Sequence, residues 1–240
     1  MDFTGKRAVV TGGVGGIGAA ISQALHAAGA DVTATGYDQA EVEARRAAPG
    51  LGGIRLAPLN VGDDAAVRAF AADTGEIDLL VNCAGTTARG PDAFEEDAFQ
   101  HVLDVNLTGT MRCCRAFHGT LAARAGAIVN IASMMSYVGS GTAPGYAASK
   151  GGVALLTKSL AIAWAEQGIR VNAVAPGWIV TPLTDRQIDP ALRERVIART
   201  PMRRWGEPRF IADAVAFLCS DKASFITGVI LPVDGGYLAM

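Results

Sequence analysis

Short apolar runs alternate along this chain with longer stretches in which apolar residues recur at helical spacing. The apolar runs predict seven β-strands, at residues 8–10, 32–35, 54–57, 79–82, 127–132, 170–175 and 229–233. The Ala-rich stretches between them predict helices at about 16–28, 39–47, 63–73, 99–123, 146–167 and 208–220. Strands and helices that alternate in this way build βαβ units around a parallel sheet. We therefore expect an α/β fold: a doubly wound, Rossmann-like sheet of seven parallel strands with helices on both faces.

Nothing in the pattern divides the chain into two units, because no Pro/Gly/Ser-rich linker, repeat or low-complexity tract interrupts it. Its 240 residues are enough for one sizeable core. Residues 176–208 are weakly patterned and long for a connection. We expect a single domain over residues 1–240, with a partly helical lid at about 178–208.

Composition and charge narrow the range of partners. Lys and Arg number 21 against 23 Asp and Glu, a net charge of −2 with no basic stripe, so nucleic acid is not an expected partner. The four cysteines and three histidines lack metal-ligand spacing, and we expect no metal site. No segment approaches the roughly 20 uninterrupted apolar residues of a membrane span. The first ten residues also lack a cationic leader, so we expect a cytoplasmic protein without a membrane partner.

A glycine-rich turn lies between the first predicted strand and the first predicted helix. Residues 11–18 read Thr-Gly-Gly-Val-Gly-Gly-Ile-Gly. Glycines at this place allow a tight turn and a close approach of the backbone to a pyrophosphate, which the helix N-terminus attracts. A glycine run alone is often only a flexible loop, but the order strand, turn, helix favours nucleotide binding.

The spacing Thr-Gly-x-x-x-Gly-x-Gly resembles the short-chain dehydrogenase/reductase family. Other family motifs follow in order over nearly the whole chain: Asn-Cys-Ala-Gly at 82–85, Asn106, Ser133, Tyr-Ala-Ala-Ser-Lys at 146–150, Pro-Gly at 176–177 and Asp-Gly-Gly at 234–236. Cys83 departs from the family pattern, since it replaces the second Asn of Asn-Asn-Ala-Gly. The resemblance implies one dinucleotide-binding and catalytic domain that interconverts a secondary alcohol and a ketone with a nicotinamide cofactor.

Four residues are candidates for catalysis. Tyr146 and Lys150 are four apart in a predicted helix and share a face, where an ammonium group would lower the tyrosine pKa. By the resemblance, Tyr146 exchanges the proton and Lys150 also holds the nicotinamide ribose. Ser133 would hydrogen-bond the substrate oxygen, and Asn106 would position a water that links the lysine to solvent. The ordinary alternatives are a surface Tyr with a solvated Lys, a turn-forming Ser and a structural Asn within a helix.

The resemblance also implies a cofactor site at the carboxyl ends of the strands. The expected cofactor-binding residues are Gly12, Val14, Gly15, Gly16, Ile17, Gly18, Gly36, Tyr37, Asp38, Asn60, Val61, Asn82, Ala84, Gly85, Tyr146, Lys150, Pro176, Gly177, Ile179 and Thr181. Thr181 is equally explained as part of a turn that starts a helix.

The choice between the two nicotinamide cofactors depends on charges near the second strand. Gly36 stands where an NAD-selective family member has an acidic residue. No cation for a 2′-phosphate is present at Gly13, Val14, Gly15, Gly36 or Tyr37. Asp38 could reach the adenosine ribose, although a helix N-cap explains it equally well. We expect NAD(H), while Arg45 and Arg46 leave NADP(H) binding open.

The substrate pocket is expected to include Ser133, Met135, Tyr146 and Trp178, a mixture of polar and apolar groups. We expect a small polar hydroxy or keto compound, such as a polyol or a sugar acid. The alternative is a 3-oxoacyl thioester of acyl-carrier protein or CoA, whose phosphates would need the lid cations Arg186, Arg193, Arg195, Arg199, Arg203 and Arg204. These arginines are equally explained as a solvated helix face. A catalytically silent nucleotide-binding regulator is a further alternative, which the four catalytic candidates make less favourable.

The resemblance implies a homotetramer in which the helices at 99–123 and 146–167 pack across two-fold axes. Both segments are rich in small and apolar residues. One such face would also be buried inside a monomer, so this composition does not by itself demonstrate assembly.

Overall fold

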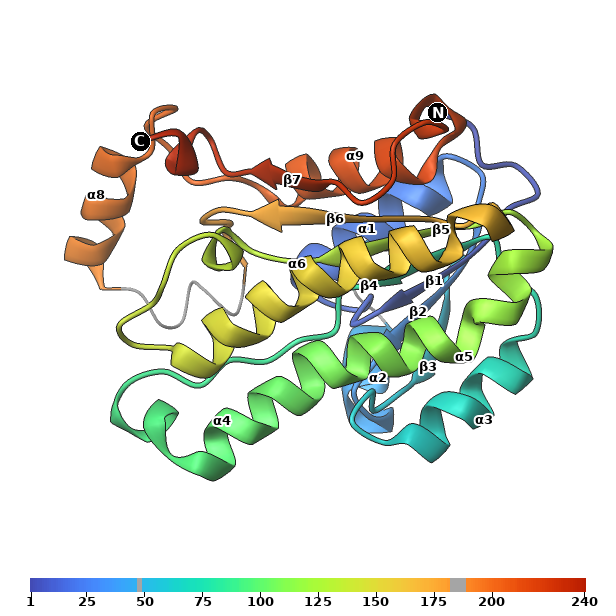
Figure 1. Cartoon of the computed structure of the whole chain (residues 1–240), viewed down its shortest axis with the longest axis horizontal. Coiled ribbons are helices and arrows are strands. Elements are labelled where there is room, and N and C mark those ends of the chain that lie inside the picture. The colour runs from blue at the N-terminus through green and yellow to red at the C-terminus, as the bar shows by residue number, and fades with distance from the viewer. Residues whose placement is uncertain (47–48, 182–188) are drawn as a thin grey trace.

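A computed structural model describes residues 1–46, 49–181 and 189–240. Seven parallel strands form one sheet in the order β3-β2-β1-β4-β5-β6-β7 (Figure 1). The strands are β1 (Arg7–Thr11), β2 (Asp31–Gly36), β3 (Arg55–Pro58), β4 (Leu79–Asn82), β5 (Ala127–Ile131), β6 (Arg170–Pro176) and β7 (Ile230–Val233). The strand order reverses between β1 and β4, the place where doubly wound sheets open a ligand crevice. The predicted fold class is confirmed.

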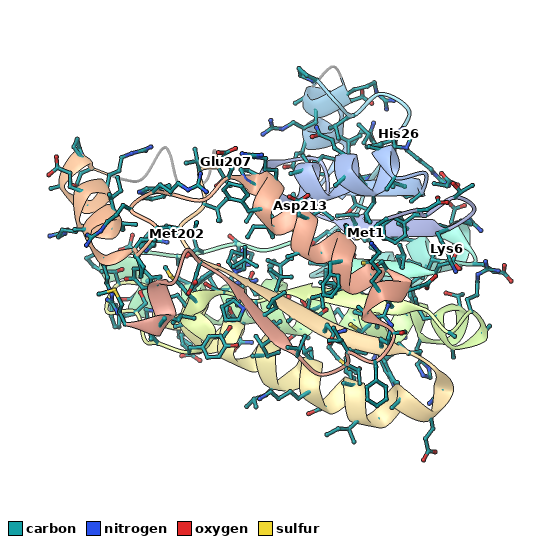
Figure 2. The ribbon with its side chains drawn as sticks, turned by 90° about the horizontal axis from the view of Figure 1, so that it is seen from above. Met1, Lys6, His26, Met202, Glu207 and Asp213 are labelled. Carbon is teal, nitrogen blue, oxygen red and sulfur yellow. The ribbon has the colours of Figure 1, made fainter. Side chains whose placement is uncertain are left out.

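Helices cover both faces of the sheet. α1 (Gly16–Ala27) and α9 (Pro208–Cys219) pack on one face, and the other carries α3 (Asp64–Thr74), α5 (Gly109–Ala123) and α6 (Pro144–Trp164). Figure 2, where Glu207 and Asp213 mark α9, shows that helix and the yellow α6 on opposite sides of the strands. Strands enclosed on both faces are mostly apolar. β4 and β5 are accordingly wholly buried, and their two asparagines, Asn82 and Asn130, form a hydrogen bond with each other.

The remaining elements lie at the edges and ends of the sheet. They are α2 (Gln39–Arg46), α4 (Glu96–Leu103), α8 (Pro190–Arg199), the π-helical turn η2 (Asp104–Thr108) and the short 3-10 helices η1 (Pro91–Phe94), η3 (Met134–Ser136), η4 (Ala165–Gln167), η5 (Asp221–Ala223) and η6 (Tyr237–Ala239). Local sequence sets several helix starts. Asp63 accepts hydrogen bonds from Ala65 N and Ala66 N at the start of α3, and Asp189 accepts one from Leu192 N at the start of α8.

The helices expected at 99–123 and 146–167 differ from the prediction in their details. The first begins three residues earlier, at Glu96, and the π-helical turn η2 separates α4 from α5. A π turn adds a residue to one helical turn, and an apolar periodicity does not reveal that insertion. The second starts at Pro144, whose ring suits the first helical turn, and its last residues form η4. The helix expected at 39–47 extends to Arg46, and residue 47 lies outside the described residues.

The segment expected to form a lid contains α8, and an isolated β-bridge between Ile179 and Gly206 joins the two ends of this segment. Figure 1 shows α8 beyond the carboxyl ends of the strands, on the side where β6 and β7 point. Residues 182–188, including Arg186, lie outside the described residues. Within the described part of the chain, no helix is long and apolar enough to cross a bilayer, and no cluster of three or more potential metal ligands is found.

Candidate active site

The glycines in the turn after β1 are required by close contacts with the protein's own backbone. Gly12 has φ +62°, and a Cβ there would lie 2.8 Å from the Cα of Ala84. A Cβ at Gly18 would lie 2.1 Å from the carbonyl oxygen of Gly12. Thr11 joins this turn to the end of β4, because its Oγ1 accepts hydrogen bonds from Cys83 N and Ala84 N at 3.1 and 3.2 Å. The turn is thus held without the second Asn that Cys83 replaces.

A cleft of about 700 Å³ runs from this turn along the carboxyl ends of the strands. Among the expected cofactor-binding residues, those that line it are Gly12, Gly15, Gly16, Ile17, Gly18, Tyr37, Asn60, Val61, Ala84, Gly85, Tyr146, Lys150 and Thr181. The α1 N-terminus has no side-chain cap, so its amide groups are open to an anion in the cleft. The glycine cradle and the size of the cleft fit a nicotinamide dinucleotide.

The other expected cofactor-binding residues do not line the cleft: Val14, Gly36, Asp38, Asn82, Pro176, Gly177 and Ile179. Val14 is buried in the core beneath the turn. Asn82 points into a buried network, where its Nδ2 donates to Asn130 Oδ1 at 2.8 Å. Asp38 caps α2, since its Oδ1 accepts from Glu41 N at 2.8 Å. Val14, Asn82 and Asp38 therefore support the walls of the site through packing and hydrogen bonds, and they do not face the cleft.

Arg45, which the sequence left open as a phosphate contact, also lines the cleft. Sequence reasoning did not place seven other residues there: Glu41, Leu59, Cys83, Thr86, His101, Val105 and Ile131. Several of these residues could have been predicted, because they lie at or just after the end of a strand. Leu59 follows β3, Cys83 and Thr86 follow β4, and Ile131 ends β5. Parallel strands present their carboxyl ends to the same crevice.

Tyr146 and Ser133 meet at the catalytic end of the cleft. Tyr146 lies in the first turns of α6, and its hydroxyl lies near enough to the side chain of Ser133, which follows β5, for that side chain to lower the tyrosine pKa. The Ser133 Oγ also accepts a hydrogen bond from Met135 N at 3.1 Å, which caps η3 and fixes the serine side chain. The structure therefore brings the expected proton-transfer group and the expected oxygen-binding group close together.

The pKa of Tyr146 is raised above its ordinary value of 10.0, contrary to the expected lowering. Burial is the main cause, because it disfavours the charged phenolate. The Ser133 side chain and the positive charge of Arg89 act in the opposite direction and are outweighed. Lys150 does not lower this pKa, since its ammonium nitrogen lies 5.7 Å from the centre of the tyrosine ring and donates to Ile131 O at 2.6 Å.

Lys150 is buried, with only 5% of its surface exposed. Burial lowers its pKa from 10.5 to about 8, with a small opposing effect from Cys83. The same burial raises the pKa of the Cys83 thiol to about 11, so the thiol is neutral at neutral pH. Lys150 is thus a cation that loses its proton readily, at the floor of the cleft and one helical turn from Tyr146.

Asn106 lies in the π-helical turn and is fully buried. Its Oδ1 accepts from Thr86 N at 2.8 Å, and its Nδ2 donates to Thr86 O at 2.9 Å and to Ser149 Oγ at 3.0 Å. The amide therefore ties the loop after β4 to α6 next to Tyr146 and Lys150. A Cβ on Gly85 would lie 3.2 Å from Asn106 Oδ1 and 3.8 Å from Lys150 Nζ, so the residue has to be small.

Of the other residues expected in the substrate pocket, Met135 contacts Ser133, whereas Trp178 lines a different cavity. Met135 contributes the backbone N–H that holds Ser133. Trp178 packs its ring 5.3 Å from that of Trp205 and lines a separate cavity of about 170 Å³ under the lid. The Arg89 guanidinium lies 5.9 Å from the Trp178 ring centre, and its positive charge lowers the pKa of Tyr146.

Known proteins share both this sequence and this fold. A family model described as Enoyl-(Acyl carrier protein) reductase matches residues 12–238. Galactitol 2-dehydrogenase (L-tagatose-forming) of Cereibacter sphaeroides is 43% identical over 244 residues, which cover 97% of this chain and 95% of that protein. The chain belongs to the short-chain dehydrogenase/reductase family.

Other members of the family are similar over the same length. The 3-oxoacyl-[acyl-carrier-protein] reductase FabG of Escherichia coli (strain K12) is 38% identical over 242 residues, 98% of either chain. A crystal structure of an Agrobacterium tumefaciens protein assigned as a 2-deoxy-D-gluconate 3-dehydrogenase, with bound NADP, has a TM-score of 0.91 and 39% identity, and covers 100% of this chain and 98% of that one. As a short-chain dehydrogenase/reductase, the protein is an NAD(P)-dependent oxidoreductase that acts on CH–OH groups.

Proposed function

We propose that this protein interconverts a secondary alcohol and a ketone in a small polar compound, a polyol or a sugar acid. The observation that carries the proposal is the placement of Ser133 beside Tyr146, at a cleft that Tyr146 and Lys150 both line. A nucleotide-binding regulator would have no use for this pair beside a buried lysine. The galactitol dehydrogenase and the A. tumefaciens protein give the proposal its substrate class.

The protein's own groups bind the substrate oxygen and move its proton. When bound, the nicotinamide supplies the hydride chemistry. Ser133 donates a hydrogen bond to the substrate oxygen, and Tyr146 Oη gives or takes the proton. The raised pKa of Tyr146 keeps its hydroxyl protonated at neutral pH, which suits proton donation to a ketone. Lys150 and the glycine-rich turn hold the two ends of the cofactor.

Arg89 supports a substrate with a carboxylate. Its charge reaches Tyr146, and the described residues offer it no acidic partner. The loop position is fixed, because Gly90 N donates to Thr142 O at 3.0 Å, four residues before Tyr146. A carboxylate of a sugar acid would find at Arg89 the bidentate donor that it prefers.

Matched pairs of acids and alcohols test this function. Gluconate against sorbitol, and galactonate against galactitol, differ only in a carboxylate at the end of the chain. We expect wild-type oxidation of both classes with a higher kcat/KM for the acids, and a loss of about tenfold on the acids alone in Arg89→Met. Wild-type protein that oxidises neither class would overturn the proposed substrate class.

A 3-oxoacyl thioester is the second candidate, favoured by the likeness to FabG and by exposed arginines of the lid. In the structure Arg193 stacks on Trp205, Arg199 on Tyr237 and Arg204 on Phe210, while their charged ends remain exposed and could meet carrier phosphates. Arg186 lies outside the described residues. Acetoacetyl-CoA decides between the candidates, since strong reduction of this thioester with no turnover of polyols or sugar acids would reverse their order.

We also propose a preference for NAD(H) over NADP(H). No cation is present in the glycine-rich turn itself or at the end of β2. The carboxylate that supports the preference belongs to Glu41, which lines the cleft, rather than to Asp38, which caps α2. The comparison of kcat/KM for the two cofactors tests this, and a wild-type preference of tenfold for NADP(H) would contradict it.

Assembly and location belong to the same proposal. A homotetramer is supported by Leu155 and Ile162, which are 67% and 81% exposed and lie seven residues apart on one side of α6. A cytoplasmic location is supported by the cysteines, since all four are free thiols.

A further inference from the structure

The adenosine end of the cleft carries two charges that the strand-end pattern does not predict. Gly36 ends β2 without a side chain, Tyr37 is uncharged, and Asp38 uses its carboxylate as a helix cap. The charges come instead from Glu41 and Arg45, four residues apart on one face of α2, and both side chains line the cleft. Both are half-buried, whereas their neighbours Glu43 and Arg46 are exposed.

Glu41 holds its carboxylate over the end of β2. Its Oε2 accepts a hydrogen bond from Tyr37 N at 2.7 Å, and a Cβ on Gly36 would lie only 3.1 Å from the same oxygen. The carboxylate therefore occupies the space into which a side chain at position 36 would point. Its other oxygen, Oε1, has no partner among the described residues and is available to a ligand hydroxyl.

Arg45 reaches back toward the glycine-rich turn. Its Nη2 lies 3.8 Å from the position of a Cβ on Gly15. The described part of the chain provides no ion pair or hydrogen bond for this guanidinium, and it does not pair with Glu41, although a spacing of four residues permits such a pair. A carboxylate and an unpaired cation thus stand on either side of the place where the adenosine enters.

We propose that Glu41 binds the adenosine ribose and excludes a 2′-phosphate, and that Arg45 forms a latent phosphate site that Glu41 suppresses. This inference rests on the proposed cofactor preference and assigns it to two residues of α2. A carboxylate that accepts from ribose hydroxyls stabilises NAD(H), whereas a 2′-phosphate would place like charges together. Without the carboxylate, Arg45 can offer a phosphate the forked donors of its guanidinium.

The adenosine fragments 5′-AMP and 2′,5′-ADP test the inference by calorimetric titration, without any turnover. We expect wild type to bind 5′-AMP more tightly, and Glu41→Gln to reverse the order with a gain of about tenfold for 2′,5′-ADP. Gln can still accept from Tyr37 N, so the variant keeps this local contact. Glu43→Gln is the matched control, because it removes the same charge two residues along α2 and away from the cleft.

The double variant Glu41→Gln/Arg45→Gln identifies the cation. It should lose the gain for 2′,5′-ADP, and kcat/KM for NADP(H) should follow the same order among the variants. A fragment preference that Glu41→Gln leaves unchanged, or a gain that survives removal of Arg45, overturns the inference while the oxidoreductase function stands. Wild-type protein that binds neither fragment and turns over neither cofactor would instead overturn the proposed function.

Discussion

At the residue scale, Tyr146 has the most specific role in the proposed mechanism, because it alone would exchange a proton with the substrate. Tyr146→Phe removes the hydroxyl that we propose moves the proton and leaves the ring in place. We expect turnover to fall by about 100-fold or more, with the fold and cofactor affinity retained. Steady-state kinetics and a cofactor titration measure the two quantities separately, and wild-type turnover in this variant would exclude Tyr146 as the proton donor.

Lys150 gives the site a pH dependence of folding. Its pKa is about 8 in the folded protein and 10.5 ordinarily, so between these values the unfolded chain binds more protons. The contribution of this lysine to the free energy of unfolding therefore increases with pH across that window, by at most about 1.4 kcal/mol per pH unit. Below pH 8 both states carry the charge, and its burial destabilises the fold to the full extent.

Lys150→Met removes this titration. In chemical denaturation of the cofactor-free protein, the stability of wild type relative to the variant should rise from pH 8 toward pH 10. Equal pH dependence in the two proteins would show that Lys150 carries its charge at an ordinary pKa.

Among the elements, the π-helical turn between α4 and α5 is the one that positions the site most directly. It presents the Asn106 amide to Thr86 and Ser149, and so joins the loop after β4 to the helix that carries Tyr146. Asn106→Ala should lower the free energy of unfolding by about 3 kcal/mol, because buried partners lose their hydrogen bonds. Asn106→Asp keeps the acceptor for Thr86 N but loses both donated hydrogen bonds, so it should also be less stable than wild type. Equal stability of all three proteins by denaturant unfolding would contradict this role.

The pattern of the chain predicted the seven strands within a residue or two, because enclosed parallel strands are short apolar runs bounded by helices. It also assigned Ser133 and Tyr146 to one site, since the family motifs put one after β5 and the other on α6, and the two side chains lie near each other in the structure. It did not predict the π turn, because the extra residue shifts the apolar positions by only one within a stretch that otherwise has helical period. It left both Arg45 and Arg46 open as phosphate contacts and did not predict that Glu41 faces the cleft, because the rotation of α2 is set by the burial of Val42 against the sheet rather than by charge.

In the molecule taken as a whole, the exposed apolar stripe of α6 bears on assembly. Leu155→Glu with Ile162→Glu would put two carboxylates where the proposed two-fold packing buries apolar side chains. We expect light scattering at micromolar concentration to give a tetramer mass for wild type and a smaller species for the double variant. A monomeric wild type would contradict the proposed homotetramer.

Hydride transfer itself is the most direct test of the proposed function. Sorbitol and gluconate, deuterated at their carbinol carbons, are incubated with the protein and NAD, and the reduced cofactor is examined by mass spectrometry. The account predicts one deuterium in the reduced nicotinamide for each ketone formed from whichever compound is oxidised, and almost none with Tyr146→Phe. Ketone formed without deuterium in the cofactor, or equal transfer in Tyr146→Phe, would contradict it.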